Sequence, residues 1–187
     1  MSRTDKLSLG YVAALAGRRP DAVDAETPRF PLANIATVRA KLRELFISQR
    51  CTQLVCAAAC GADLLALEAA TELGIQIHIV LPFPTRDFRE MSVVDRPGEW
   101  GELYDRMVTK AKEQGHLYLL GYKPTDKTAF SKTTKAIINH ALKIAQGAQV
   151  WAVVVWEGKS RGEEDETQEF AELSHEMGFH KVEVLTL

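Results

Sequence analysis

The sequence has little net charge, few cysteines and no long apolar run. Its 187 residues carry a net charge of −2, which argues against nucleic acid as a partner, since proteins that bind it usually have a basic excess. Three cysteines, an odd number, form no disulfide framework and indicate a reducing, cytoplasmic setting. No apolar run reaches the roughly 18 residues that a membrane-spanning helix needs, so we expect none.

Motifs that define several common enzyme classes are also absent. The sequence has no GxSxG, no GxxxxGK[ST] and no complete GxGxxG, which argues against a serine hydrolase, a P-loop NTPase and a standard NAD dehydrogenase. Its cysteines lack CxxC spacing, and its five histidines lack HExxH spacing. We therefore predict no metal and no cofactor.

The composition favours a folded protein of modest size. Apolar residues make up 46% of the chain and charged residues 26%, and we predict one domain over residues 1–187. Arg3 and Lys6 before an apolar stretch resemble a weak signal peptide, but Gly17 ends that stretch, so we interpret residues 11–16 as a first strand. The chain ends within an apolar segment, which fits a complete small protein or a domain of a longer one.

Short apolar runs alternate with helical patterns along the chain. Strands are predicted at 9–16, 53–58, 75–81, 116–120, 150–156 and 182–187, and helices at 34–49, 62–73, 99–113, 131–146 and 167–177; residues 84–98 are predicted to be irregular. Continuous apolar strands indicate a sheet covered on both faces. This pattern predicts an α/β fold with an open, mainly parallel sheet. Ligands bind such sheets at the carboxyl ends of the strands.

The loop after the first strand reads Gly17-Arg18-Arg19-Pro20. Gly17 permits a tight turn, and the two arginines could hold a phosphate or carboxylate with forked donors. The alternative is a solvated loop that contains a turn glycine.

The turn after the second strand is built from small residues and ends in an acid. It comprises Ala57, Ala58, Ala59, Cys60, Gly61, Ala62 and Asp63. Small side chains let a ligand approach the backbone, and the amides of a following helix suit a phosphate. Asp63 could accept a ribose hydroxyl or cap the helix, and the small residues could serve packing alone.

Two further loops hold candidate residues. Pro82 and Phe83 end the third strand and Ser92 follows; Phe83 could stack on a base or belong to the core. Glu157 and Gly158 end the fifth strand, where Glu157 could act as a base or hold a ribose. The acidic run at 163–166 would repel a phosphate and would pair with the dipole of the next helix.

Together these motifs resemble the SLOG superfamily, which includes LOG phosphoribohydrolases, DprA and the ligand-sensing domains of TRPM channels. Gly17 and Arg19 match a Gly-His-Arg motif in which Arg18 replaces the histidine. The small-Gly-Ala-Asp turn matches at four positions, Ala59, Gly61, Ala62 and Asp63, and a helical asparagine matches Asn139. The resemblance implies a Rossmann-like sheet with helices on both faces, which binds nucleotides or nucleotide-derived signals.

The chain departs from the LOG hydrolases at their Pro-Gly-Gly-x-Gly-Thr loop. Only Gly162 and Thr167 align there, and Phe170 stands where those enzymes carry a glutamate, with Glu169 one residue before it. The resemblance therefore favours a nucleotide-derivative binding domain, sensory or regulatory, which could form a homo-oligomer or be fused to an effector domain. The alternative is a nucleoside 5′-monophosphate phosphoribohydrolase with Glu157 or Glu169 as catalytic carboxylate, Arg19 on the phosphate and Thr167 in the ligand site.

Overall fold

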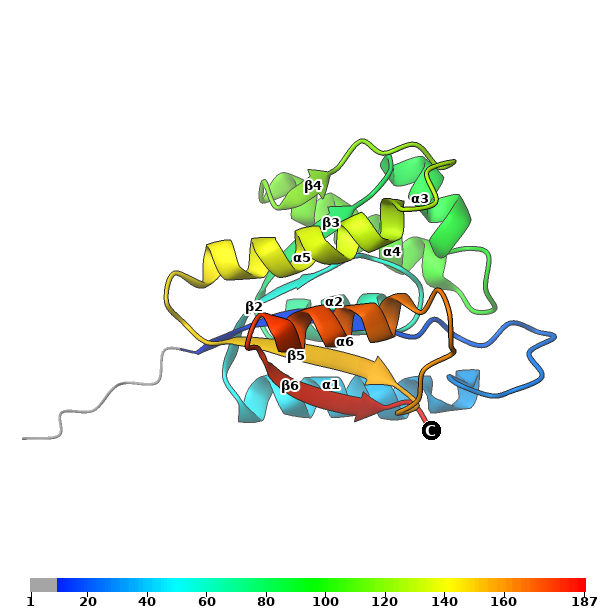
Figure 1. The fold of residues 1–187 in the computed structure, drawn as a ribbon, viewed down its shortest axis with the longest axis horizontal. Helices are drawn as coiled ribbons and strands as arrows, with labels where there is room; N and C mark the ends of the chain where they lie inside the picture. Colours follow the sequence, from blue (N-terminus) through cyan, green and yellow to red (C-terminus); the bar gives the residue numbers. More distant parts are fainter. Residues whose placement is uncertain (1–9) are drawn as a thin grey trace, which may run out of the picture.

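A six-stranded parallel sheet forms the centre of the molecule. The computed structural model describes residues 10–187, and the strand order is β4-β3-β2-β1-β5-β6 (Figure 1). Every neighbouring pair is parallel. The strands are β1 (Tyr11–Gly17), β2 (Cys51–Cys56), β3 (Gln76–Leu81), β4 (Leu117–Leu119), β5 (Val150–Trp156) and β6 (His180–Leu185). This is the predicted α/β, Rossmann-like open sheet.

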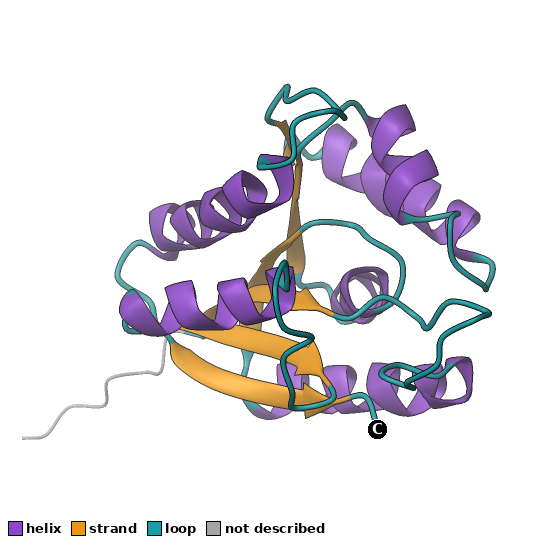
Figure 2. Cartoon of the chain, turned by 45° about the vertical axis from the view of Figure 1, so that its right-hand side comes forward, coloured by secondary structure: helices purple, strands orange, loops and turns teal. Residues whose placement is uncertain are grey.

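Helices cover both faces of the sheet (Figure 2). They are α1 (Ile35–Ser48), α2 (Ala62–Glu72), α3 (Thr85–Ser92), α4 (Trp100–Glu113), α5 (Ala129–Ala145) and α6 (Glu166–Glu176), with a 3₁₀ turn at Leu32–Asn34. Helices α1, α2 and α4 pack on one face, and α5 and α6 pack on the other. Alternate residues of β1 enter the two cores, Ala13 and Leu15 on one side and Val12 and Ala14 on the other.

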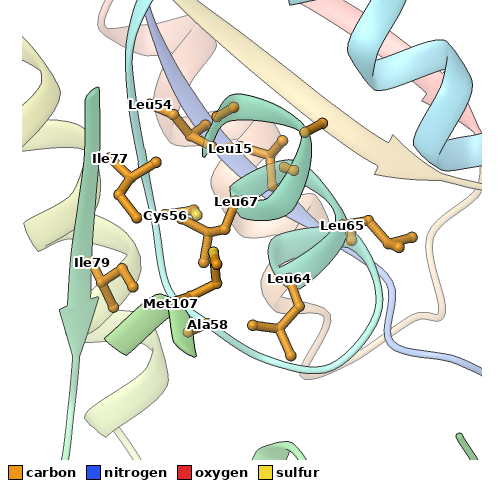
Figure 3. Packing of buried hydrophobic residues seen from close by; sticks show 14 of the residues in the cluster. Leu15, Leu54, Cys56, Ala58, Leu64, Leu65, Leu67, Ile77, Ile79 and Met107 are labelled. Atoms are coloured by element: carbon orange, nitrogen blue, oxygen red, sulfur yellow. The ribbon is translucent and has the colours of Figure 1, made fainter. Parts of the chain in front are cut away.

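Helix α2 is the most deeply buried helix of the first face. Leu64 and Leu67 are fully buried among β-strand residues such as Leu54 and Ile77, and Met107 of α4 closes the same cluster (Figure 3). Burial of one such leucine contributes roughly 1.5–3 kcal/mol. The core therefore fixes the beginning of α2 against the carboxyl ends of β1 and β2.

The structure corrects several predicted boundaries. Residues 84–98 are not wholly irregular, because Thr85–Ser92 form α3, in which Phe88 enters the core and most other side chains stay polar. Strand β2 spans Cys51–Cys56 rather than 53–58, β6 begins at His180 rather than residue 182, and α5 begins at Ala129 rather than residue 131. The apolar stretch is strand from Tyr11, whereas Arg3 and Lys6 lie outside the described residues. Within residues 10–187, no helix is long and apolar enough to cross a membrane.

The strand order reverses between β1 and β5. From β1 the chain builds outward through β2, β3 and β4, then returns to place β5 on the other side of β1. In open α/β sheets the crevice at such a point, outside the carboxyl ends of the strands, is where ligands bind. The fold therefore indicates where to look for a site.

Candidate functional site

A cavity of about 770 Å³ lies at this point of the sheet. One wall is apolar and the rim is charged. The apolar wall includes Leu15, Pro82, Phe88, Phe130 and Ile137. The charged groups around it are Arg19, Arg29, Arg96 and Arg161, together with Asp21, Glu26, Glu163, Glu164 and Glu166. Both the volume and the mixture of an apolar wall with a few polar groups are typical of small-molecule sites.

Gly17 and Gly61 allow the β1 loop to pack tightly against α2. A Cβ atom on Gly17 would lie 2.5 Å from the Cβ of Ala62 and 2.6 Å from the carbonyl oxygen of Val155. Gly61 has a φ of +91°, and a Cβ there would lie 2.8 Å from the carbonyl oxygen of Arg18. These glycines therefore serve close approach between strand, loop and helix, as small residues do in related turns.

The amides that open α2 are largely engaged within the protein. The Cys60 amide donates to the Ser92 carbonyl at 3.0 Å, and the Ala62 amide donates to the Arg18 carbonyl at 3.1 Å. The Ala59 amide donates to Asp63 Oδ2 at 3.1 Å. The expectation that these amides cradle a phosphate is therefore wrong for these three groups, because each already has an acceptor.

Asp63 is the acid that the helix α2 presents to the cavity. Asp63 is only 7% exposed. It lies in the first turn of α2 and lines the cavity. Burial raises its pKa to about 7, although the Ala59 N–H and the charge of Arg19 both oppose that rise. Near neutral pH this carboxyl group exists in both forms, so it can donate or accept a hydrogen bond.

Arg18 is held in a buried ion-pair network rather than free for a ligand. Its Nε donates to Glu157 Oε2 at 2.7 Å, and its Nη1 donates to Asp165 Oδ1 at 2.6 Å. Its Nη2 donates to the Lys159 carbonyl at 2.7 Å. The side chain is 3% exposed. Although Arg18 borders the cavity, its donors are directed at β5 and at the beginning of α6.

The two carboxylates of this network have further partners. Arg29 also donates to Glu157 Oε1. Asp165 caps α6 by accepting the amides of Thr167 and Gln168, at 3.1 and 3.3 Å. Burial raises the pKa of Asp165, but the hydrogen bonds from Arg18 and from the Arg161 and Gln168 amides, with the charge of Arg18, together outweigh it and lower that pKa to about 2. Burial also raises the pKa of Glu157, but the hydrogen bonds from Arg18, a backbone amide and Arg29, with the charge of Arg18, together lower it below its usual value.

This network was missed by sequence reasoning, which separated its members. Arg18 and Asp165 lie 147 positions apart in the chain, so no local pattern connects them. Asp165 stood within an acidic run that we assigned to the helix dipole. The sequence did contain a signal for the role of Asp165 as a helix cap. Gln168 follows Asp165 by three residues, and this spacing matches a helix capping box.

Arg19 lies on the rim of the cavity. Its Nη1 contacts both carboxylate oxygens of Asp95, at 2.8 and 2.7 Å, and both side chains remain about 30% exposed. Such a partly exposed pair is worth little energetically. Arg19 can therefore exchange this partner for an anionic ligand at small cost.

The structure brings about half of the predicted site residues to the cavity. The residues that line it are Gly17, Arg18, Arg19, Ala59, Asp63, Pro82, Ser92 and Thr167. Outside the lining are Cys60, Gly61, Ala62, Phe83, Asn139, Glu157, Gly158 and Glu169.

Four of the outlying residues have clear structural reasons. Phe83 is fully buried and meets Phe130 edge-on with ring centroids 5.6 Å apart, so it belongs to the core. Asn139 is exposed on α5. Glu169 accepts from Ser131 and lines a second cavity of about 740 Å³ between α5 and α6. Glu157 is occupied by Arg18 and Arg29.

Among residues 10–187, no group of three or more histidine, cysteine, aspartate or glutamate side chains is placed to hold a metal ion. The site is therefore described by its carboxylates, arginines and apolar wall.

The comparisons with known proteins bear on the fold alone. No family model matches the chain, and no curated protein matches it. Among solved structures, it is similar to the X-ray structure of DNA processing protein A (DprA) from Streptococcus pneumoniae, with 14% identity and a TM-score of 0.41. The match covers 92% of this chain and 58% of that one, so this chain spans little more than half of its length.

Proposed function

We propose that the chain is a nucleotide-derivative binding domain with a sensory or regulatory role, the ligand being ADP-ribose-like or another nucleotide signal. One observation carries the proposal. The cavity at the strand reversal joins an apolar wall to an arginine-bearing rim and a buried acid. The apolar wall can hold a base, the arginines of the rim can bind a phosphate, and the buried acid can pair with a ribose hydroxyl.

The apolar wall and the charged rim suit the two ends of such a ligand. Phe130 and Ile137 of α5 line the cavity together with Pro82 and Phe88, and these apolar groups offer a surface for a heterocyclic ring. Arg19 and Arg96 are cationic groups of the same lining, and the charge of Arg19 acts on Asp63. The volume of about 770 Å³ lies in the range of sites that enclose ligands of nucleotide size.

The hydrolase alternative has less support from this geometry. Its two carboxylate candidates, Glu157 and Glu169, lie outside the cavity lining and already accept hydrogen bonds. Asp63, the buried acid of the lining, is the group that we assign to a ribose hydroxyl rather than to catalysis. The proposal is therefore binding without cleavage. Nucleic acid remains disfavoured by the net charge, and a homo-oligomer or fused effector remains a prediction.

The test is a thermal-shift panel of AMP, ADP-ribose, NAD, cyclic ADP-ribose isomers and cytokinin-type nucleotides, followed by chromatography of each mixture. A ligand at 100 times its Kd adds about 2.7 kcal/mol, which for a chain of this size raises Tm by about 5–10 °C. We expect a shift with the ligand recovered intact. Release of free base would support the hydrolase instead, and no shift with any compound would refute the proposal.

Variants of cavity residues test whether the ligand binds in the cavity. Arg19→Ala and Asp63→Asn remove the rim cation and the buried acid, and we expect both to reduce the shift. Arg43→Ala is the matched control, because Arg43 is an exposed arginine on α1, away from the cavity lining. Equal shifts in wild type and both site variants would show that another surface binds the ligand.

A further inference from the structure

Three histidines gather on the sheet face that α5 covers. His78 lies in β3, His116 directly precedes β4, and His140 belongs to α5. The rings of His78 and His116 stack with centroids 4.2 Å apart, and those of His78 and His140 are 5.1 Å apart. We call these three residues the histidine cluster. None of them lines the cavity.

The hydrogen bonds of the cluster fit a neutral His78. His78 Nε2 lies 3.2 Å from Gln53 Oε1, an acceptor, so this nitrogen carries the proton. His78 Nδ1 is then the acceptor, and it faces His140 Nε2 at 3.1 Å and the Tyr118 hydroxyl at 3.4 Å. With a proton on both nitrogens of His78 and of His140, two N–H donors would face each other. The bond between β3 and α5 therefore requires that the two rings are not both charged.

Within residues 10–187, no carboxylate is among the groups that shift the pKa of His78 or His140. Toward His78 the surroundings of the cluster present the amide of Gln53 from β2, the imidazoles of His116 and His140, and the phenol of Tyr118 from β4. The pKa of His140 is lowered chiefly by burial and, to a smaller extent, by the charges of Lys143, on α5, and of His116. Burial, followed by His116 and His140, lowers the pKa of His78 to about 4. A positive charge here is opposed from each side.

Helix α5 connects the cluster to the cavity. Phe130, Thr133 and Ile137 line the cavity and recur at spacings of three and four residues, and His140 continues the same stripe one turn later. In Figure 1, α5 (yellow) runs across the sheet beside β3. The contact that protonation would disrupt therefore lies on the same helix face as the cavity wall.

We propose that the histidine cluster is a proton-sensitive latch that holds α5 on the sheet at neutral pH and releases it on acidification, opening the wall of the cavity. The first proton can enter on His140 Nδ1 and leave its Nε2–H bond to His78 intact. The next proton, on His78 Nδ1, breaks that bond. His78 and His140 therefore lose their shared bond only after both have taken up a proton. The consequence for a ligand rests on the proposed function, but the latch itself does not.

The test measures hydrogen exchange of the full chain without ligand. Protection of α5 is compared with that of α1, which packs on the opposite face, at pH 7 and pH 5 after correction for intrinsic rates. A histidine with a pKa of about 4 in place and 6.5 when released makes opening about 20-fold more favourable at pH 5 than at pH 7. We expect a selective loss of α5 protection of this order.

Two variants test whether the histidine cluster causes the pH-dependent loss of α5 protection. His78→Gln removes the proton acceptor, and His140→Gln, at a half-buried position, removes its partner with less risk to folding. We expect His78→Gln to show a much smaller difference between the two pH values. His140→Gln should show a partly reduced difference, because the burial of His78 remains. His175→Gln, on exposed α6 surface, is the control and should behave as wild type. The proposal is overturned if α5 and α1 lose protection equally, if wild-type α5 shows no pH effect, or if His78→Gln retains the full effect. Because no ligand is present, these results are independent of the thermal-shift panel.

Discussion

Removing the guanidinium of Arg18 should destabilise the protein far more than removing an ordinary surface charge. Arg18→Met leaves an apolar side chain of similar length beside Glu157 and Asp165, which are 5% and 1% exposed at their side chains. Asp165 would keep its backbone donors, and Glu157 would keep Arg29. Both carboxylates would nonetheless lose their most deeply buried cation, since Arg29 and Arg161, which remain, are partly exposed.

The magnitude follows from two independent estimates. Breaking a buried ion pair by removing one partner costs about 3–5 kcal/mol. For Asp165 alone, the net lowering of its pKa from 3.8 to about 2, to which backbone hydrogen bonds also contribute, corresponds to about 2 kcal/mol. Glu157 adds a contribution of the same sign. We therefore expect a loss of about 3–5 kcal/mol at pH 7, which is on the order of 10 °C in Tm.

The pH dependence supplies a second check. A carboxylate with a lowered pKa in the folded state contributes stability that is present above its unfolded pKa and lost as the pH falls. For wild-type Asp165 this window runs from 3.8 down to about 2. Without Arg18, burial raises the folded-state pKa of both carboxylates, so the difference between wild type and Arg18→Met should be largest at pH 7 and shrink as the pH falls toward 3.

Urea denaturation at pH 7, 5 and 3 measures these differences. Arg19→Met is the matched control, because the Arg19–Asp95 pair is about 30% exposed and should be worth less than about 1 kcal/mol. The reasoning is refuted if Arg18→Met costs no more than Arg19→Met at pH 7. It is also refuted if the cost is unchanged at pH 3.

Three further changes test the packing and charge of the site, each by urea denaturation. Gly17→Ala should cost about 1–3 kcal/mol, since the new Cβ would meet Ala62 and Val155 at 2.5–2.6 Å; Gly101→Ala, which meets only the flexible end of Arg89, should cost far less, and equal costs would contradict the packing. Asp63→Asn should stabilise the protein above pH 7 by up to about 4 kcal/mol, because a raised carboxyl pKa makes stability fall between pH 3.8 and about 7; a loss of stability at pH 8 would show that the charged form is needed for folding. Phe83→Ala should cost about 3–5 kcal/mol because the ring is fully buried, and a cost below about 1 kcal/mol would return Phe83 to the list of ligand contacts.

Local patterns predicted the sheet and most helices because burial imposes them locally. The fully buried residues Val153, Val154 and Val155 in β5 appear in the sequence as an unbroken apolar run, and Val38, Leu42 and Phe46 of α1 keep helical spacing. Helix α3 was missed because Thr85–Ser92 is short and mostly polar, with Phe88 as its main apolar anchor. Its existence depends on packing against the core rather than on a strong local pattern.

The candidate site was predicted less completely, since its key contacts are long-range. The carboxyl ends of parallel strands meet at one edge, so Gly17, Arg19, Asp63 and Pro82 could be placed together from topology. The direction of the Arg18 side chain could not, because it depends on Glu157 and Asp165 from the far end of the chain. The same holds for the engaged amides of Cys60 and Ala62, whose acceptors come from other segments.

The central claim is that the cavity at the carboxyl ends of β1, β2 and β3 binds a nucleotide derivative. The most direct measurement is a titration of the ¹⁵N-labelled chain with ADP-ribose and AMP, followed by amide chemical shifts. We expect saturable changes confined to the β1 loop, the turn before α2, the first turns of α5 and the 161–167 loop. Changes centred on another surface, such as β6 and α1, or no saturable change with either compound, would contradict the claim.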